Sequence, residues 1–218
     1  MVRALKSERK GPETADRVVV FLHGYGADGA DLLGLADVIA PHLPGTAFYA
    51  PDAHERCVNN PFGYQWFPIP WLDGSTEEQA RASMGQSIDD INSFLDKVLA
   101  DEGLSPQQMA VIGFSQGTMM ALHVLPRRDQ PVACIIGFSG RLLVPELLEA
   151  ETKSKAPVLL LHGDQDQMVP FTDLGQAADA LAAAGFETFT HVMKGTGHGI
   201  SQDGLGAAVQ FLNTYLKP

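Results

Sequence analysis

The sequence holds only two cysteines, Cys57 and Cys134, in 218 residues. Two cysteines form neither a disulfide framework nor a cysteine metal site, and Cys134 lies in an apolar run where it is expected to be a small core residue. No apolar run approaches the roughly 18 residues of a membrane-spanning helix, and the first ten residues lack the apolar stretch of a secretory signal peptide. We therefore expect a cytoplasmic protein that holds no metal and has no membrane span.

Basic residues are also scarce, because 15 lysines and arginines face 26 aspartates and glutamates, for a net charge of −11. Such a balance disfavours nucleic acid and anionic membrane surfaces as partners. The hydrophobic content of 45% is ordinary for a globular protein and sufficient for a sizeable core. With no repeat and no break in composition, the chain is expected to form a single domain over residues 1–218.

Short apolar runs of strand type alternate with helical segments along the whole chain. The predicted strands cover residues 17–22, 46–50, 109–112, 132–136, 157–161 and 187–192. The predicted helices cover residues 75–102, 118–125, 145–152, 172–184 and 203–216, after a first helix that ends near residue 40. This alternation is typical of an α/β domain with a mainly parallel sheet.

Two helix starts and one helix end carry specific signals. Asp28 or Asp31 can cap the first helix. Residues 75–78, Ser-Thr-Glu-Glu, match a capping box at the start of the longest helix. Gly103 suits the position just after the end of that helix, where a left-handed backbone is common.

One stretch combines a predicted strand, a sharp turn and a predicted helix, with a serine in the turn. Residues 113–117 read Gly-Phe-Ser-Gln-Gly, which is the G-x-S-x-G pattern of a nucleophile elbow. The two glycines leave room for the chain to reverse tightly. The turn places the Ser115 hydroxyl at a helix N-terminus, where free backbone N–H groups favour negative charge. Five common residues can meet by chance, but the flanking strand and helix favour Ser115 as a nucleophile.

A serine nucleophile requires a neighbouring base, and His198 is the best placed of the seven histidines. Ligands of a parallel sheet bind beyond the C-terminal ends of its strands, and His198 follows the last predicted strand within residues 195–199, Gly-Thr-Gly-His-Gly. His23 and His162 each precede a glycine at a strand end, where packing is the expected role. The other four lie inside predicted elements or have no motif around them: His42, His54, His123 and His191.

The acid that orients the base is expected between Ser115 and His198 in the chain. Asp164 and Asp166 both follow a predicted strand. One of them is expected to fix the turn through its own backbone, and the other to reach the histidine. The residues alone do not separate the two.

Four motifs in order resemble the phospholipase/carboxylesterase family of α/β-hydrolases, which includes small bacterial carboxylesterases and acyl-protein thioesterases. These motifs are residues 21–28, 113–117, 162–170 and 197–199, and the likeness covers nearly the whole chain. The resemblance implies an α/β-hydrolase fold, with helices on both faces of a mainly parallel sheet and no large cap domain. It also implies hydrolysis of carboxylic esters of small to medium acyl compounds through an acyl-enzyme, with no cofactor.

The resemblance further assigns individual residues. It makes Asp166 the catalytic acid and leaves Asp164 structural. It places an oxyanion hole at the backbone N–H groups of Tyr25 and Gln116, and both follow strand ends close to the serine. Tyr25 stands where many members have leucine, and its ring is expected to narrow the entrance.

A long irregular stretch, residues 51–75, holds four prolines and an unusual number of aromatic residues, which are Phe62, Tyr64, Trp66, Phe67 and Trp71. About half of these rings are expected to pack on the core and the others to line an apolar pocket. Trp66 and Phe67 are the best candidates, since they match the family's tryptophan-containing loop. Met168, in the aspartate loop, is a third candidate for substrate binding.

Other activities on the same residues stay open at this point. An acyl-protein thioesterase or a lysophospholipase would use the same nucleophile, acid and base. A non-catalytic binding protein on this fold would usually lack one of the three, and haloalkane or epoxide hydrolases have aspartate where this chain has Ser115. The expected partner is a small-molecule ester, with no nucleic acid, and a homodimer is left open.

Overall fold

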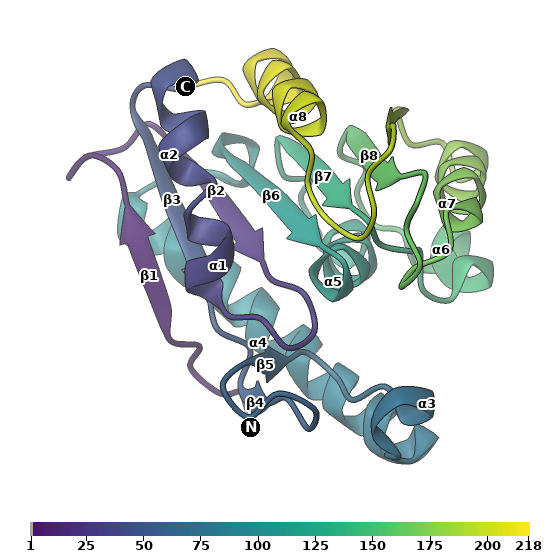
Figure 1. The fold of residues 1–218 in the computed structure, drawn as a ribbon. Helices are drawn as coiled ribbons and strands as arrows, with labels where there is room; N and C mark the ends of the chain where they lie inside the picture. Colours follow the sequence, from purple (N-terminus) through teal and green to yellow (C-terminus); the bar gives the residue numbers. More distant parts are fainter. Residues whose placement is uncertain (1) are drawn as a thin grey trace.

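The computed structural model describes residues 2–218, and a twisted sheet forms its centre (Figure 1). The strands of this sheet are β1 (Ser7–Lys10), β2 (Arg17–Leu22), β3 (Thr46–Pro51), β6 (Met109–Phe114), β7 (Cys134–Phe138), β8 (Val158–Gly163) and β9 (Thr188–Met193). They lie in the order β1-β3-β2-β6-β7-β8-β9. All neighbours run parallel except β1, which pairs with β3 in the antiparallel sense. The predicted α/β class with a mainly parallel sheet is confirmed.

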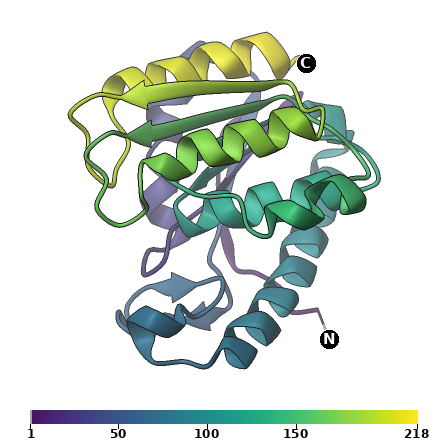
Figure 2. The same ribbon diagram turned by 90° about the vertical axis from the view of Figure 1, so that its right-hand side faces the viewer.

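Helices cover both faces of the sheet (Figures 1 and 2). One face carries α1 (Gly29–Leu33), α2 (Ala36–Ile39) and α8 (Gln202–Tyr215). The other carries α4 (Glu77–Glu102), α5 (Gln116–Val124), α6 (Pro145–Glu151) and α7 (Thr172–Ala183). Short 3-10 turns lie at Ala40–His42, Pro106–Gln108 and Leu125–Arg127.

Strand β2 shows why the central strands are apolar at every position. Its side chains alternate between the two faces, so that Val18, Val20 and Leu22 join the core under α4 and α5. Val19 and Phe21 join the core under α1, α2 and α8. A parallel strand covered by helices on both faces therefore has no solvent side, and a continuous apolar run follows.

For every predicted strand, and for every predicted helix after the first, both the first and the last residue lie within two positions of those observed. The start of α4 differs from the prediction, because its N-cap is Thr76, whose side chain accepts from the backbone N–H of Gln79. Ser75 stands one residue too early, since its own N–H donates to Asp73 in the preceding turn. Gly103 ends the helix in the left-handed conformation, with φ 69°, as predicted.

The first helix is interrupted rather than continuous. Asp28 is its N-cap, and its side chain accepts from the N–H of Asp31. Asp31 returns a hydrogen bond to the N–H of Asp28, so the two candidate caps act together in one capping box. The helix then breaks between Leu33 and Ala36 and continues as α2 and the 3-10 turn that follows.

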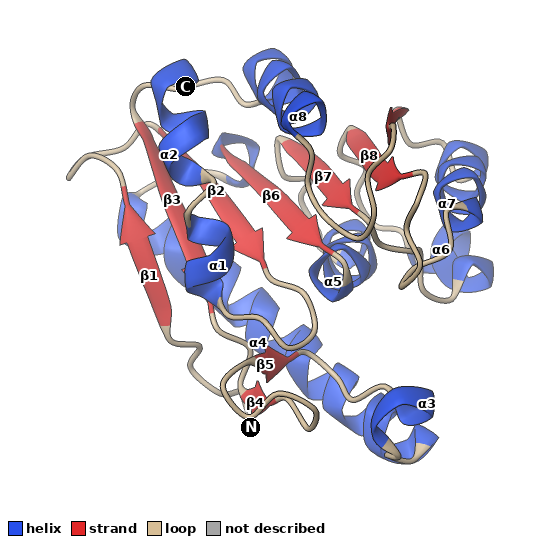
Figure 3. Cartoon of the chain, viewed as in Figure 1, coloured by secondary structure: helices blue, strands red, loops and turns tan. Residues whose placement is uncertain are grey.

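Residues 52–76, which we call the wall segment, lie beyond the C-terminal ends of the central strands (Figure 3). The segment contains the two-residue strands β4 (Glu55–Arg56) and β5 (Tyr64–Gln65) and the single turn α3 (Pro70–Asp73). Tyr64 attaches it to the loop after β2, because its backbone pairs with Ala27 and Gly26 at 2.8 Å each. These short elements agree with the expectation that no long helix or strand forms here.

Cys134 is a core residue, as predicted, and burial raises the pKa of its thiol to about 12. Cys57 is buried as well, and both cysteines are free. Within residues 2–218, every helix is too short or too polar to cross a membrane.

Candidate active site

Ser115 occupies a strained turn between β6 and α5. Its backbone has φ 52° and ψ −115°, a combination that few residues other than glycine adopt. A side chain at position 117 would collide with the carbonyl of Leu22, and one at position 113 would collide with the backbone of Thr118. The two glycines of the motif are therefore required by the close approach of neighbouring backbone. The turn aims the serine out of the sheet at its C-terminal edge.

His198 connects the serine to Asp166. Its Nε2 lies 3.0 Å from Ser115 Oγ, and its Nδ1 lies 2.8 Å from Asp166 Oδ2. Because a carboxylate only accepts, Nδ1 carries the hydrogen of that bond, which leaves Nε2 of a neutral ring free to accept the serine proton. The structure thus brings together the three residues that the sequence analysis selected.

The Asp166 carboxylate is buried, with its side chain fully shielded from solvent. Its Oδ1 accepts from the backbone N–H groups of Met168, at 2.8 Å, and Val169, at 3.0 Å. Burial alone would raise the pKa of Asp166, but the hydrogen bonds from His198, Val169 and Met168 outweigh it and lower the pKa below its usual value. The group therefore stays ionised at neutral pH.

Asp164 takes a different position from Asp166. Its Oδ1 accepts from the backbone N–H of Gly195, at 2.7 Å, and so ties the loop after β8 to the loop that carries His198. The expectation that one aspartate is structural fits this contact. However, Asp164 fixes the neighbouring loop, which carries His198, rather than the turn in which Asp164 itself lies.

The two backbone N–H groups expected in the oxyanion hole lie on either side of the serine. Gln116 is the first residue of α5, and Tyr25 follows Gly24, where an added Cβ would lie 3.3 Å from Ser115 Cβ. Among residues 2–218, neither N–H has a backbone partner. Both donors are therefore free for an oxygen bound beside Ser115.

The side chain of Gln116 has a role that the sequence analysis did not identify. Its Oε1 accepts from the backbone N–H of Trp66, at 2.8 Å, and its Nε2 donates to the carbonyl of Phe67, at 2.7 Å. One amide thus fastens the wall segment to the residue next to Ser115. Its position within G-x-S-x-G gave no signal for this contact.

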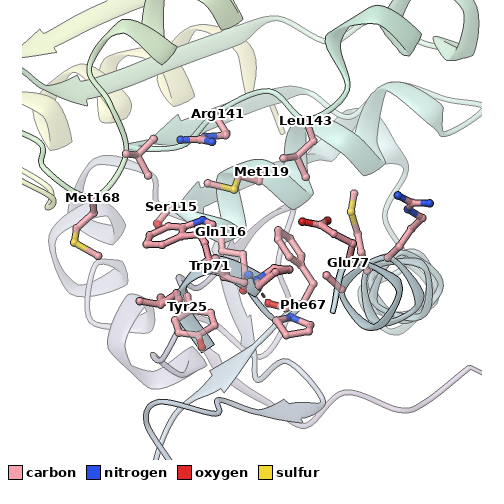
Figure 4. Close-up of a pocket in the computed structure, with 18 of the residues that line it drawn as sticks. Tyr25, Phe67, Trp71, Glu77, Ser115, Gln116, Met119, Arg141, Leu143 and Met168 are labelled. Atoms are coloured by element: carbon pink, nitrogen blue, oxygen red, sulfur yellow. Dashed lines mark hydrogen bonds between the residues drawn. The ribbon is translucent and has the colours of Figure 1, made fainter. Parts of the chain in front are cut away.

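A cavity of about 470 Å³ opens in front of Ser115 (Figure 4). In Figure 4, Ser115 and Gln116 lie near the centre of the view beside Trp71, with Met168 to the left and Phe67 to the lower right. Most of the wall is apolar and comes from the wall segment, α4, α5 and the loop after β7. The apolar wall includes Phe67, Ile69, Trp71, Met84, Met119 and Leu143. Glu77, Arg81 and Arg141 add charges to it.

Of the three residues predicted to bind substrate, Phe67 and Met168 line this cavity and Trp66 does not. Trp66 is completely buried, its indole N–H donates to the carbonyl of His23 at 2.9 Å, and its ring stacks on that of His23 with centroids 5.1 Å apart. The prediction that Trp66 binds substrate is therefore wrong, because the ring packs beneath the wall segment. Trp71, which is 76% exposed, lines the cavity instead.

The two other strand-end histidines are buried but differ in their contacts. His23 accepts from the backbone N–H of Ala53 at 2.9 Å, and burial lowers its pKa, so it packs as a neutral ring. His162 lies 3.2 Å from the Asp166 carboxylate through its Nε2 and 3.1 Å from the carbonyl of Val169. Packing, the role expected for both, describes His23 but is incomplete for His162.

The described part of the chain contains no candidate metal site. Among residues 2–218, no three histidine, cysteine, aspartate or glutamate side chains are grouped so that they could hold a metal ion.

Comparison with known proteins places this geometry in context. A family model described as Phospholipase/Carboxylesterase matches residues 8–216. The esterase YpfH of Escherichia coli (strain K12) is 25% identical over 199 residues, which make up 91% of this chain and 82% of the relative. Acyl-protein thioesterase 1 of Saccharomyces cerevisiae is 28% identical over 94% of this chain and 95% of its own length. The crystal structure of esterase PE8 is 40% identical, covers 98% of this chain and 100% of that one, and superposes with a TM-score of 0.92.

Proposed function

The chain belongs to the phospholipase/carboxylesterase family of α/β-hydrolases and is a carboxylic ester hydrolase, and on this basis we propose that Ser115, His198 and Asp166 perform the hydrolysis. One observation carries the proposal. A continuous hydrogen-bonded path runs from Asp166 Oδ2 through the imidazole of His198 to Ser115 Oγ, and that oxygen faces an apolar cavity.

In the first half of the reaction, Ser115 Oγ attacks the carbonyl carbon of the ester while His198 Nε2 takes its proton. Asp166, held in its ionised form, stabilises the imidazolium that results. The carbonyl oxygen becomes an oxyanion that accepts hydrogen bonds from the backbone N–H groups of Tyr25 and Gln116. The C–O bond to the alcohol then breaks, and His198 gives its proton to the departing oxygen.

In the second half, water replaces the alcohol. His198 Nε2 takes a proton from the water as the water oxygen attacks the acyl-enzyme carbonyl. The same two N–H groups stabilise the second oxyanion. Breakdown returns the proton to Ser115 Oγ and releases the carboxylic acid, so the enzyme is regenerated with no cofactor.

The cavity supports acyl compounds of small to medium size as substrates. Its volume of about 470 Å³ lies within the range of small-molecule sites, and its wall is mostly apolar. Thioesters are a second candidate class, because relatives in Saccharomyces cerevisiae and Yarrowia lipolytica are named acyl-protein thioesterases. The same nucleophile and oxyanion donors would act on a thioester.

The test is a panel of esters and thioesters of rising acyl length, assayed with the wild-type enzyme and with Ser115→Ala. The variant is expected to lose turnover on every substrate and to retain at most the residual catalysis of an oxyanion hole, roughly 10³ to 10⁴ over water. A fluorophosphonate probe should modify the wild-type enzyme at Ser115 and leave the variant unlabelled. Full activity in a folded Ser115→Ala enzyme would mean a different nucleophile.

We propose that the enzyme acts in the cytoplasm on small-molecule esters and does not bind nucleic acid, with a homodimer left open. Cell fractionation tests the location, and sedimentation with and without added DNA tests both the assembly and the nucleic-acid prediction.

A further inference from the structure

His162 is the second histidine in contact with the Asp166 carboxylate, and the mechanism above gives it no role. It lies near the C-terminal end of β8, and its side chain is 1% exposed. Its Nε2 is 3.2 Å from Asp166 Oδ2 and 3.1 Å from the carbonyl oxygen of Val169. The ring of Phe171 packs edge-on against it, with centroids 6.1 Å apart.

These neighbours determine where the ring carries its hydrogen. A carboxylate oxygen and a carbonyl oxygen are both acceptors, so neither can donate to the imidazole. Nε2 of His162 must therefore bear the hydrogen, in a neutral or a charged ring alike. That hydrogen is donated to the carbonyl of Val169, and Asp166 Oδ2 lies close to the same N–H, 3.2 Å from Nε2.

Two hydrogen bonds connect His162 to the carboxylate through Val169. His162 Nε2–H donates to the Val169 carbonyl, Val169 N–H donates to Asp166 Oδ1 at 3.0 Å, and Asp166 Oδ2 faces His162 Nε2 again. Oδ2 is also the atom that accepts from His198 Nδ1 at 2.8 Å. One oxygen is thus placed between two imidazoles, and the other is held by backbone.

We propose that His162 is a positioning residue for the hydrolysis, because its Nε2–H holds Val169, whose own N–H holds the Asp166 carboxylate in the place from which Oδ2 orients His198. The inference rests on the proposed role of Asp166. Without this donor, Val169 loses its tie to β8, and the carboxylate that its N–H holds loses alignment with His198 Nδ1. His162 is buried and does not line the cavity, so the loss is expected in kcat rather than in KM.

Three variants separate this role from simple packing. His162→Gln keeps a donor, since its amide nitrogen stands the same number of bonds from Cα as the imidazole Nε2. His162→Asn keeps the amide but is one bond too short to reach the Val169 carbonyl, and His162→Met fills the space without a donor. We expect kcat to fall on the order of tenfold to a hundredfold in the Asn and Met variants, by analogy with residues that orient metal ligands. KM should change little, and the Gln variant should recover most of the rate.

His191 provides the matched control. It also contacts an aspartate through Nε2, at 2.8 Å from Asp203 Oδ2, but on β9 and α8, away from the serine. His191→Met should leave kcat unchanged. The proton of His198 Nδ1 offers a direct readout, because its NMR resonance reports the bond to Asp166. It should shift or broaden in His162→Asn and stay in place in His162→Gln and His191→Met.

A double-variant cycle distinguishes failure of this inference from failure of the proposed function. In an Asp166→Asn background, His162→Asn should add little further loss, because both changes act on the same carboxylate. If Asp166→Asn alone leaves kcat intact, the proposed triad is wrong. If Asp166→Asn is costly while folded His162→Asn and His162→Gln are equally active with unchanged resonances, only the role of His162 is overturned. If His162→Met does not fold, the comparison of His162→Gln with His162→Asn decides the question.

Discussion

The two sides of the cavity hold their side chains in place by different means. On the side of the sheet, Ser115 and Asp166 follow strand ends and are buried, each 9% exposed as a whole residue. They are fixed by tight turns and by hydrogen bonds within buried structure. On the facing side, the wall segment has only short elements and exposes Trp71 by 76% and Phe62 by 85%. A few polar contacts attach it to the sheet, notably those of Gln116 and the hydrogen bond from Tyr25 Oη to Asp73 Oδ2 at 3.1 Å.

This difference indicates a division of work. Catalytic groups need their geometry held within fractions of an ångström, which parallel strand ends provide. A wall that selects acyl groups contributes through apolar area, and area tolerates a less constrained segment. We therefore expect changes on the sheet side to alter turnover of all substrates and changes in the exposed part of the wall segment to alter the preference among them.

The largest expected effect tests the sheet side. Asp166→Asn should lower kcat by about 10⁴, because an amide in place of the carboxylate favours the wrong tautomer of His198. Asp164→Asn is the matched change in the same loop, and it should cost far less, since Asp164 contacts Gly195 rather than His198. Steady-state kinetics on one ester, with circular dichroism as a check of folding, measures both. If the Asp164 variant proves the less active enzyme while folded, the two aspartates have been assigned the wrong way round.

The second prediction separates the buried part of the wall segment from the exposed part. Trp66→Ala should destabilise the protein by about 3–5 kcal/mol, because it removes a fully buried ring and the hydrogen bond to His23. For a domain of this size, the loss lowers Tm on the order of 10 °C. Trp71→Ala, on a ring that is mostly exposed, should leave Tm within a degree or two. Thermal unfolding of both variants measures the two Tm values. Equal Tm values would contradict the burial of Trp66.

The third prediction concerns selectivity. Trp71→Ala removes apolar surface from the cavity wall, so long acyl chains should lose more than short ones. At about 0.8 kcal/mol per buried CH₂, two lost methylene contacts lower kcat/KM roughly tenfold. Acetyl, butyryl and octanoyl esters, assayed with the same alcohol, measure the trend. An equal loss on all three would remove Trp71 from the acyl site and leave Phe67 as the next residue to test.

The sequence predicted the position of side chains correctly where that position depends on local turn chemistry. The elbow around Ser115 and the loop of His198 could be predicted because glycine spacing and strand ends are local features. The choice of Asp166 over Asp164 needed the family resemblance, since both residues follow the same strand and only the fold decides which carboxylate reaches the histidine.

The sequence did not predict features that depend on burial or on contacts between residues far apart in the chain. Trp66 and Trp71 are both aromatic residues of one irregular segment, and nothing local shows that the first turns inward onto His23. Strand β1 was missed because Ser7–Lys10 is polar and mostly exposed, and an edge strand of that kind carries no apolar alternation. The contact of His162 with Asp166 was likewise hidden, since a histidine before a strand-end glycine reads as packing.

The smallest expected effect tests the contact between the two sides. Asp73 accepts from Tyr25 Oη, and from the backbone N–H groups of Ile69, at 2.7 Å, and Ser75, at 3.0 Å. Burial opposes its charge, but these hydrogen bonds outweigh burial and lower its pKa below the usual 3.8. A lowered pKa means that the stabilisation is fully present above the ordinary pKa and is lost as pH falls through the lowered one.

Asp73→Asn should therefore reduce stability at pH 7, by about 1 kcal/mol for weakened hydrogen bonds to a charged group at a partly exposed site, and should reduce it less at pH 3. Tyr25→Phe keeps the backbone N–H and removes only the hydroxyl, so it should produce a smaller loss of the same kind. Urea unfolding at both pH values measures the difference. A loss that is the same at pH 7 and pH 3 would show that the Asp73 charge does not hold the wall segment against the sheet.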